Sequence, residues 1–171
     1  MSSAVLHIHH SDGLYTIQVV GRATFECVAP LRNLAKQLET EEFQKVHVDL
    51  SQCGGMDSTF MGILAMLGLR AKKVGAEMVI AKAGELNKSL LFGLGLKKLF
   101  TYNEDEMPCV EGNDSPACSL ENRMDSAKTV LDAHKTLMDV DDENRKKFEK
   151  VVDLVQQDID RMNNYSGDGK N

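Results

Sequence analysis

The sequence predicts an α/β protein with a mixed β-sheet and helices packed on it, followed by a C-terminal helical hairpin. Short runs in which β-branched and apolar residues alternate with polar ones are typical of strands. They are interleaved with segments whose apolar residues recur three and four positions apart, as in helices. The expected order is β, β, α, β, α, β, α, β, and each strand-helix-strand passage requires a crossover, which makes the sheet mixed.

A β-hairpin is predicted at the start of the chain. Val5–His10 and Leu14–Val20 alternate like strands and flank an Asp-Gly step, which is a strong hairpin signal. Gly21 is expected to end the second strand. Residues 27–38 then show apolar side chains at helical spacing, with Pro30 in the first turn, where proline is tolerated.

The centre of the predicted sheet is a strand from Val46 to Leu50, followed by a long helix. The glycines at 54 and 55 are expected to make a tight reversal, because glycine adopts unusual backbone angles readily. From Thr59 onward apolar residues follow a helical rhythm that stops at Gly75, a typical C-terminal signal. Ser58 should therefore lie at or beside the first residue of this helix.

The remaining sheet elements are shorter. Glu77–Ala81 is predicted to be a strand, and a short helix follows that the glycines at 93 and 95 terminate. Leu96–Tyr102 is expected to complete the sheet. The short helix should bury one face, which carries Leu86, Leu90 and Leu91.

Composition divides the chain into a domain (1–102), an acidic linker (103–118), a helical hairpin (119–163) and a frayed tail (164–171). The net charge of −6 is uneven: residues 1–102 hold 11 Lys/Arg against 9 Asp/Glu, and residues 103–171 hold 9 against 17. The chain has no basic stripe of the kind that nucleic acid binding requires, so a direct nucleic acid partner is not expected.

The predicted hairpin has an apolar seam. Asp141 is a suitable N-cap for its second helix. Two heptads are too few to be stable alone, so the seam should pack on the domain, on a partner or on a second copy; we favour a homodimer through these helices. His134 is expected to be a core or rim residue without chemistry. The seam positions are Leu120, Met124, Ala127, Leu131, His134 and Met138 in the first helix and Phe148, Val152, Val155, Ile159 and Met162 in the second.

Several classes of function are not supported by the sequence. No targeting signal or membrane span is predicted, and a reducing cytoplasm is the expected compartment. The four cysteines, Cys27, Cys53, Cys109 and Cys118, have no metal-binding spacing, and no metal or cofactor is expected. The chain has no P-loop, no Gly-x-Ser-x-Gly elbow and no His-x-x-x-His pair, and a lone serine without a base is not a nucleophile. We therefore expect a binding module and not an enzyme.

Ser58 has two interpretations. Either Asp57 or Ser58 is simply the N-cap of the helix, a role that contributes about 0.5 to 2 kcal/mol. Alternatively, Ser58 is a phosphorylation site, because a phosphate there would meet unpaired N–H groups and the positive end of the helix dipole. Spacing does not separate the two interpretations.

Residues 4–102 resemble a STAS domain, and more narrowly the bacterial anti-sigma factor antagonists. The resemblance is carried by the strand Val46–Leu50, the step Asp57-Ser58-Thr59 with its apolar helix, the stretch Gly75–Ile80 and the ending Leu91–Phe100. It implies regulation of transcription by partner switching: an anti-sigma factor that is also a serine kinase binds the unphosphorylated protein and phosphorylates Ser58. A serine phosphatase would reverse this step.

The resemblance also implies a partner-binding region formed by Asp57, Ser58, Thr59, Phe60 and Met61. One position departs from the family, because antagonists usually have glycine where this chain has Phe60. Its ring is expected either in the core, which the helical rhythm favours, or exposed as an anchor for a partner.

Two alternatives to the antagonist hypothesis remain at this point. The domain could be a STAS subunit of another assembly, such as a stressosome-like scaffold or the component of a lipid transporter, in which the serine is not modified. It could also be a small-ligand or catalytic protein that uses a pocket near Ser58; we rank this hypothesis last.

Overall fold

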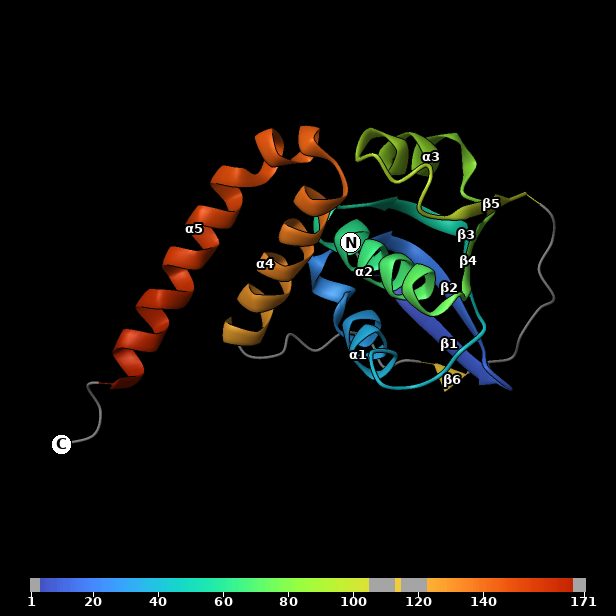
Figure 1. The fold of residues 1–171 in the computed structure, drawn as a ribbon, viewed down its shortest axis with the longest axis horizontal. Coiled ribbons are helices and arrows are strands. Elements are labelled where there is room, and N and C mark those ends of the chain that lie inside the picture. Colours follow the sequence, from blue (N-terminus) through green and yellow to red (C-terminus); the bar gives the residue numbers. More distant parts are fainter. Residues whose placement is uncertain (1–3, 105–112, 115–122, 168–171) are drawn as a thin grey trace.

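The computed structural model describes residues 4–104, 113–114 and 123–167, and in these residues one mixed six-stranded sheet carries the helices (Figure 1). The strands are β1 (Val5–Ser11), β2 (Leu14–Ala23), β3 (Lys45–Met56), β4 (Glu77–Ala81), β5 (Thr101–Asn103) and β6 (Asn113–Asp114). The helices are the 3₁₀ helix η1 (Phe25–Cys27), α1 (Ala29–Gln37), α2 (Ser58–Val74), α3 (Gly84–Gly93), α4 (Arg123–Val140) and α5 (Asp142–Gly167). The predicted fold class is confirmed.

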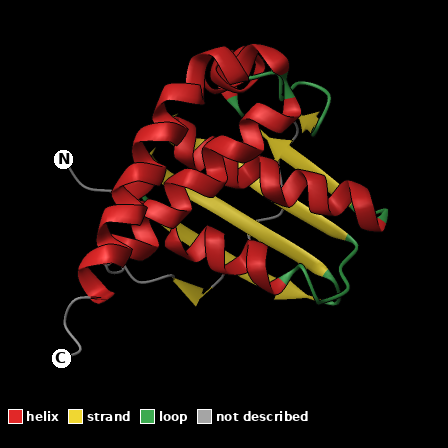
Figure 2. Cartoon of the chain, turned by 60° about the vertical axis from the view of Figure 1, so that its left-hand side comes forward, coloured by secondary structure: helices red, strands yellow, loops and turns green. Residues whose placement is uncertain are grey.

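The strand order across the sheet is β5-β4-β3-β2-β1-β6. β1 and β2 form the predicted antiparallel hairpin, and Asp12 and Gly13 at its tip both have positive φ, as a two-residue hairpin turn requires. β2, β3, β4 and β5 run parallel to one another. Helices α1 and α2 therefore provide crossovers, and Figure 2 shows the helices lying across a face of the sheet.

Two glycine predictions for the sheet were wrong. Gly21 does not end β2, which continues to Ala23; instead Gly21, at φ 103°, lies where the pairing of β2 with β3 shifts. Likewise, Gly54 and Gly55 do not make a tight reversal, because β3 continues through them to Met56 and stays paired with β2. Glycines inside a strand mark irregular pairing here, not its end.

The two edges of the sheet also differ from the prediction. β5 comprises only three residues, and residues 96–100 of the predicted strand form turns whose Leu96 and Phe100 are nevertheless buried in the core. β6 comes from the predicted linker: Asn113 and Asp114 pair with Ile8 and His7 of β1. The rest of that linker lies outside the described residues.

The helices of the domain follow the predicted order with local corrections. The helix predicted at 27–38 is divided into η1, which Thr24 caps, and α1. In α3 Leu91 is buried and Leu90 partly buried, but Leu86 is 60% exposed, so the predicted three-leucine face is wrong in its first turn. The buried residue of that turn is instead Asn87, whose amide donates to the carbonyl of Cys53.

The C-terminal helices form the predicted antiparallel hairpin. Asp141 caps α5, because its Oδ1 accepts from the N–H of Glu143 at 2.9 Å. α5 continues to Gly167, so the fraying predicted from residue 164 is wrong over 164–167; residues 168–171 and the first predicted seam residue, Leu120, lie outside the described residues.

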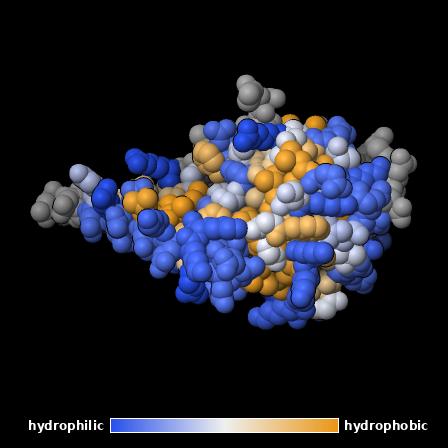
Figure 3. All heavy atoms as spheres, turned by 90° about the horizontal axis from the view of Figure 1, so that it is seen from above, coloured by the Kyte–Doolittle hydropathy of each residue, from blue (hydrophilic) through white to orange (hydrophobic). Residues whose placement is uncertain are grey.

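α4 packs on α2 of the same chain, and Ala133 and Leu137 of α4 belong to the main core. The domain therefore provides a covering surface for α4 within the chain, and the homodimer that we favoured stays a prediction. α5 lies on the outer side of α4 (Figure 1). Figure 3 shows the hairpin projecting from the body with a largely hydrophilic surface.

Candidate functional site

The first turn of α2 is positioned by Asp57. This residue is the N-cap: its Oδ1 accepts from the N–H of Phe60 at 2.9 Å, and its Oδ2 accepts from the N–H of Phe25 at 2.7 Å. Both carboxylate oxygens are thus occupied, and the start of α2 is tied to the start of η1. Ser58 follows as the first helical residue, with a hydroxyl that capping does not require.

The Ser58 hydroxyl is hydrogen-bonded to a histidine from the other end of the sequence. Its Oγ lies 2.8 Å from Nε2 of His134 in α4, and Nδ1 of His134 lies 2.7 Å from the carbonyl oxygen of Val130. A carbonyl oxygen only accepts, so Nδ1 carries the proton; in the neutral ring Nε2 then accepts from the Ser58 hydroxyl. The sequence indicated no role for His134 because 76 residues separate the two partners.

The ring of His134 is enclosed on its other side by α5. It is 4% exposed and meets the ring of Phe148 edge to face, with 4.9 Å between the centroids. His134 thus links Ser58 of the domain to both helices of the hairpin.

Close approach of α2 and α4 depends on two small residues. A Cβ atom on Gly62 would lie 2.5 Å from the carbonyl oxygen of Ala133 and 2.7 Å from its Cβ, so no side chain fits at position 62. Gly62 is one helical turn beyond Ser58 and shares its face. This glycine and Ala133, next to His134, are the sequence signals that could have suggested the contact.

A second contact joins the hairpin turn to the end of α3. The buried amide of Asn144 donates to the carbonyl oxygens of Leu94 and Leu137, and Lys147 Nζ donates to the carbonyl oxygen of Gly93, each at 2.8 Å. A cation at a helix C-terminus is favourable because the last carbonyl groups have no partner in the helix. The hairpin is therefore attached at both α2 and α3.

The predicted partner-binding residues differ in accessibility. Asp57 and Ser58 are half-buried, whereas Thr59, Phe60 and Met61 are buried at 5%, 0% and 4% exposure. For Phe60 the favoured alternative, burial in the core, is confirmed. The assignment of these five residues to a partner surface stays a prediction.

His134 gives Ser58 the neighbouring base that the sequence did not indicate, but the pair differs from those of serine hydrolases. Such sites orient the base with a further polar side chain, whereas His134 donates to a main-chain carbonyl of its own helix and is covered by Phe148. Among the described residues, no cluster of three or more His, Cys, Asp or Glu could hold a metal ion. Over the same part of the chain, no helix has the length and apolar character needed to cross a bilayer.

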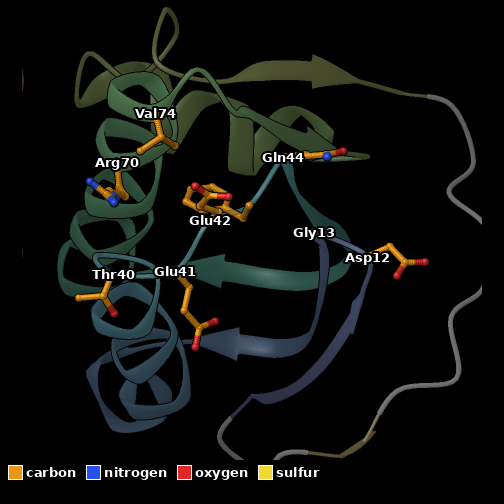
Figure 4. A pocket seen from close by; sticks show the side chains of 9 residues that line it. Asp12, Gly13, Thr40, Glu41, Glu42, Gln44, Arg70 and Val74 are labelled. Atoms are coloured by element: carbon orange, nitrogen blue, oxygen red, sulfur yellow. The ribbon is translucent and has the colours of Figure 1, made fainter.

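A cavity with polar groups in its lining lies at the opposite end of β3 from Ser58 (Figure 4). It has a volume of about 590 Å³ and is lined by the β1–β2 turn, the segment before β3 and the end of α2. Two of its charged groups have partners: Glu41 accepts from the Tyr15 hydroxyl at 3.2 Å, and Arg70 Nε donates to the carbonyl oxygen of Leu38. Burial, followed by the contact with Glu41, raises the pKa of Tyr15.

Comparisons with known proteins agree with this architecture. Residues 6–101 match a family model described as "Mlab, STAS domain", which is more than half of the chain. The chain therefore belongs to the STAS domain family. The match ends before α4, so the hairpin lies outside the family domain. No curated protein matches the chain.

Solved structures show the same fold. The unphosphorylated anti-sigma factor antagonist SpoIIAA is similar with a TM-score of 0.51 and 10% identity, covering 60% of this chain and 89% of that one. An anti-sigma factor antagonist from Thermotoga maritima, whose assignment is itself provisional, gives a TM-score of 0.52 and 13% identity, covering 58% and 86%. Both likenesses concern the fold.

Proposed function

We propose that this chain is a bacterial, cytoplasmic anti-sigma factor antagonist that acts by partner switching. In its unphosphorylated form it binds an anti-sigma factor with serine kinase activity, and phosphorylation at Ser58 releases that partner. The observation that carries the proposal is the position of Ser58 in a STAS fold. Ser58 is the first residue of α2, and its hydroxyl is not needed as the helix cap because Asp57 is the N-cap.

The chemistry at Ser58 is ordinary phosphoryl transfer. The Oγ–P bond forms as the bond between the γ-phosphorus of ATP and its bridging oxygen breaks; ADP leaves with the electron pair, and the hydroxyl proton passes to a base of the kinase. Hydrolysis by a serine phosphatase returns the hydroxyl and releases inorganic phosphate. The added phosphate carries about −1.5 to −2 charges at neutral pH, which changes the surface presented at the helix start.

The alternative is a STAS scaffold or a subunit of another assembly in which Ser58 is not modified. One observation favours it: the Ser58 hydroxyl already has a partner in His134. In that case Ser58 is a structural residue that holds the hairpin on the domain.

Intact mass measurement separates the two proposals. Wild-type protein is incubated with ATP and each serine-kinase anti-sigma factor of the source genome, beside Ser58→Ala and the matched control Thr59→Val, whose neighbouring hydroxyl is buried. The antagonist proposal expects one phosphate on wild type and Thr59→Val and none on Ser58→Ala. A phosphate that persists in Ser58→Ala, or no phosphate with any of these kinases, would reject it.

Binding provides the second measurement. Ser58→Ala should remain folded and retain binding to the kinase partner, because alanine removes only the acceptor hydroxyl. Ser58→Asp should weaken binding partially, since it adds one negative charge where a phosphate adds up to about two. Failure of Ser58→Ala to bind a partner that wild type binds would contradict the switch.

A further inference from the structure

The residues of α2 that face the hairpin form a surface suited to a helix. Ser58 and Gly62 are four residues apart and therefore adjacent on one face. We call this the Ser58 face. A glycine at the crossing point lets two helix backbones approach closely, and the hydroxyl one turn earlier offers a hydrogen bond that fixes the position of the incoming helix.

α4 occupies the Ser58 face in the manner of a helical ligand. It places Ala133 against Gly62 and the adjacent His134 against the Ser58 hydroxyl. The Ser58 face thus favours a helix with two features: a small residue where it crosses Gly62, and beside it a polar residue that hydrogen-bonds to Ser58. This is the helix-in-groove mode of recognition, realised within one chain.

The hairpin lies outside the part of the chain that corresponds to the family domain. The family match ends at residue 101, and the SpoIIAA structure aligns over 89% of its own length with only 60% of this chain. α4 and α5 also pack against each other, so α4 retains a packing partner when the hairpin leaves the domain.

The contact between hairpin and domain is closely packed only in part. Between the hairpin turn, α2 and the loop after α3 lies a cavity of about 560 Å³. Its lining is rich in charged side chains, among them Lys72, Lys98, Asp139 and Asp141. Ion pairs between such solvent-exposed charges contribute little to docking, which favours a hairpin that can be displaced.

We propose that the Ser58 face is a helix-binding surface on which α4 acts as a tethered competing ligand. A partner protein then reaches Ser58 only by replacing α4 with an amphipathic helix of its own, which presents a small residue opposite Gly62 and a hydrogen-bond acceptor opposite Ser58. This inference deepens the proposed function and rests on it for the identity of the partner, an anti-sigma factor.

The proposal also connects displacement to modification. Ser58 Oγ and His134 Nε2 are in direct hydrogen-bond contact at 2.8 Å, and His134 is enclosed by Phe148. A phosphoryl group on Oγ occupies the place of the imidazole ring, so α4 and a phosphate exclude each other. The kinase therefore acts on the open form, and the phosphorylated chain remains open.

The test uses the full chain and a synthetic peptide of residues 123–140, labelled with a fluorophore. Ala133→Leu should release α4, because the backbones at Gly62 leave no room for a larger side chain. The matched control, Ala127→Leu, makes the same change at a half-buried position about 120° around the helix. Gly62→Leu combined with Ala133→Leu blocks the Ser58 face itself.

We expect the peptide to bind Ala133→Leu about tenfold or more tightly than wild type or Ala127→Leu, because an occupied site reduces apparent affinity by its open fraction. The double variant should lose this gain. Hydrogen exchange should become faster in the first turn of α2 in Ala133→Leu while β3 and β4 stay protected. Lys147→Ala, which removes an exposed anchor, should shift both readouts in the same direction by less.

Two outcomes would overturn the inference. One is unchanged exchange at α2 in Ala133→Leu and Lys147→Ala; the other is peptide binding that the Gly62→Leu change does not reduce. If Ala133→Leu also loses protection in β3 and β4, the substitution has loosened the whole domain. The exchange and peptide binding of Lys147→Ala then decide whether the hairpin is displaceable. Neither readout needs a kinase or an anti-sigma factor, so a failure of the proposed function leaves this test interpretable, and the reverse also holds.

Discussion

The hydrogen bond between Ser58 and His134 should be measurable as a coupling energy. Ser58→Ala removes the hydroxyl that donates to His134. The side chain of His134 is only 4% exposed, so its Nε2 is then buried without a hydrogen-bond partner. An unsatisfied buried polar atom costs about 1 to 3 kcal/mol. For a protein of this length, each 1 kcal/mol shifts the melting temperature by about 2 to 4 °C.

A double-mutant cycle isolates the bond from other effects. His134→Phe keeps a ring against Phe148 and removes Nε2, so the pair Ser58→Ala and His134→Phe should show a coupling of about 0.5 to 1.5 kcal/mol in urea denaturation. Ser89→Ala, at an exposed helical serine, is the control and should change the free energy of unfolding by less than about 0.5 kcal/mol. A coupling below about 0.3 kcal/mol would refute the hydrogen bond as a source of docking energy.

Two further predictions concern the domain. Phe60→Ala should lower the free energy of unfolding by about 3 to 5 kcal/mol in the same assay, because the ring is 0% exposed; a fall in melting temperature of only a degree or two would contradict its burial. Burial raises the pKa of Tyr102 to about 12, so in an alkaline titration its phenolate absorbance should appear near that pH in wild type and be missing in Tyr102→Phe. Because the folded state holds this proton more tightly, Tyr102 stabilises the fold below pH 10, and that contribution should be lost as the pH rises towards 12 in wild type but not in Tyr102→Phe.

Local signals in the sequence were sufficient for α2. Gly75, at φ 74°, ends it as predicted, and the structure assigns the N-cap to Asp57, one of the two residues between which the sequence left the choice open. Both signals act within one helical turn, where the backbone groups that need partners are set by the neighbouring residues. The burial of Phe60 also followed from helical spacing alone.

Features that depend on distant segments were not predictable in this way. Gly54 and Gly55 are compatible with a turn or with an irregular strand, and pairing with β2 decides between them. The acidic composition around Asn113 gives no sign that it joins β1. The contact of Ser58 with His134 requires knowing that α4 crosses α2, which neither helix encodes by itself.

The sheet has long strands inside and very short ones at its margins. β2 and β3 contain 10 and 12 residues, while the described edges are formed by β5 and β6, with three and two residues. A long unpaired edge offers a row of N–H and C=O groups to which another chain can add a strand. Here the outermost described strands offer little length for such addition, and β6 covers His7 and Ile8 of β1. Addition of a strand from another chain onto β5 or β6 is thereby disfavoured, because so few backbone groups are available on them.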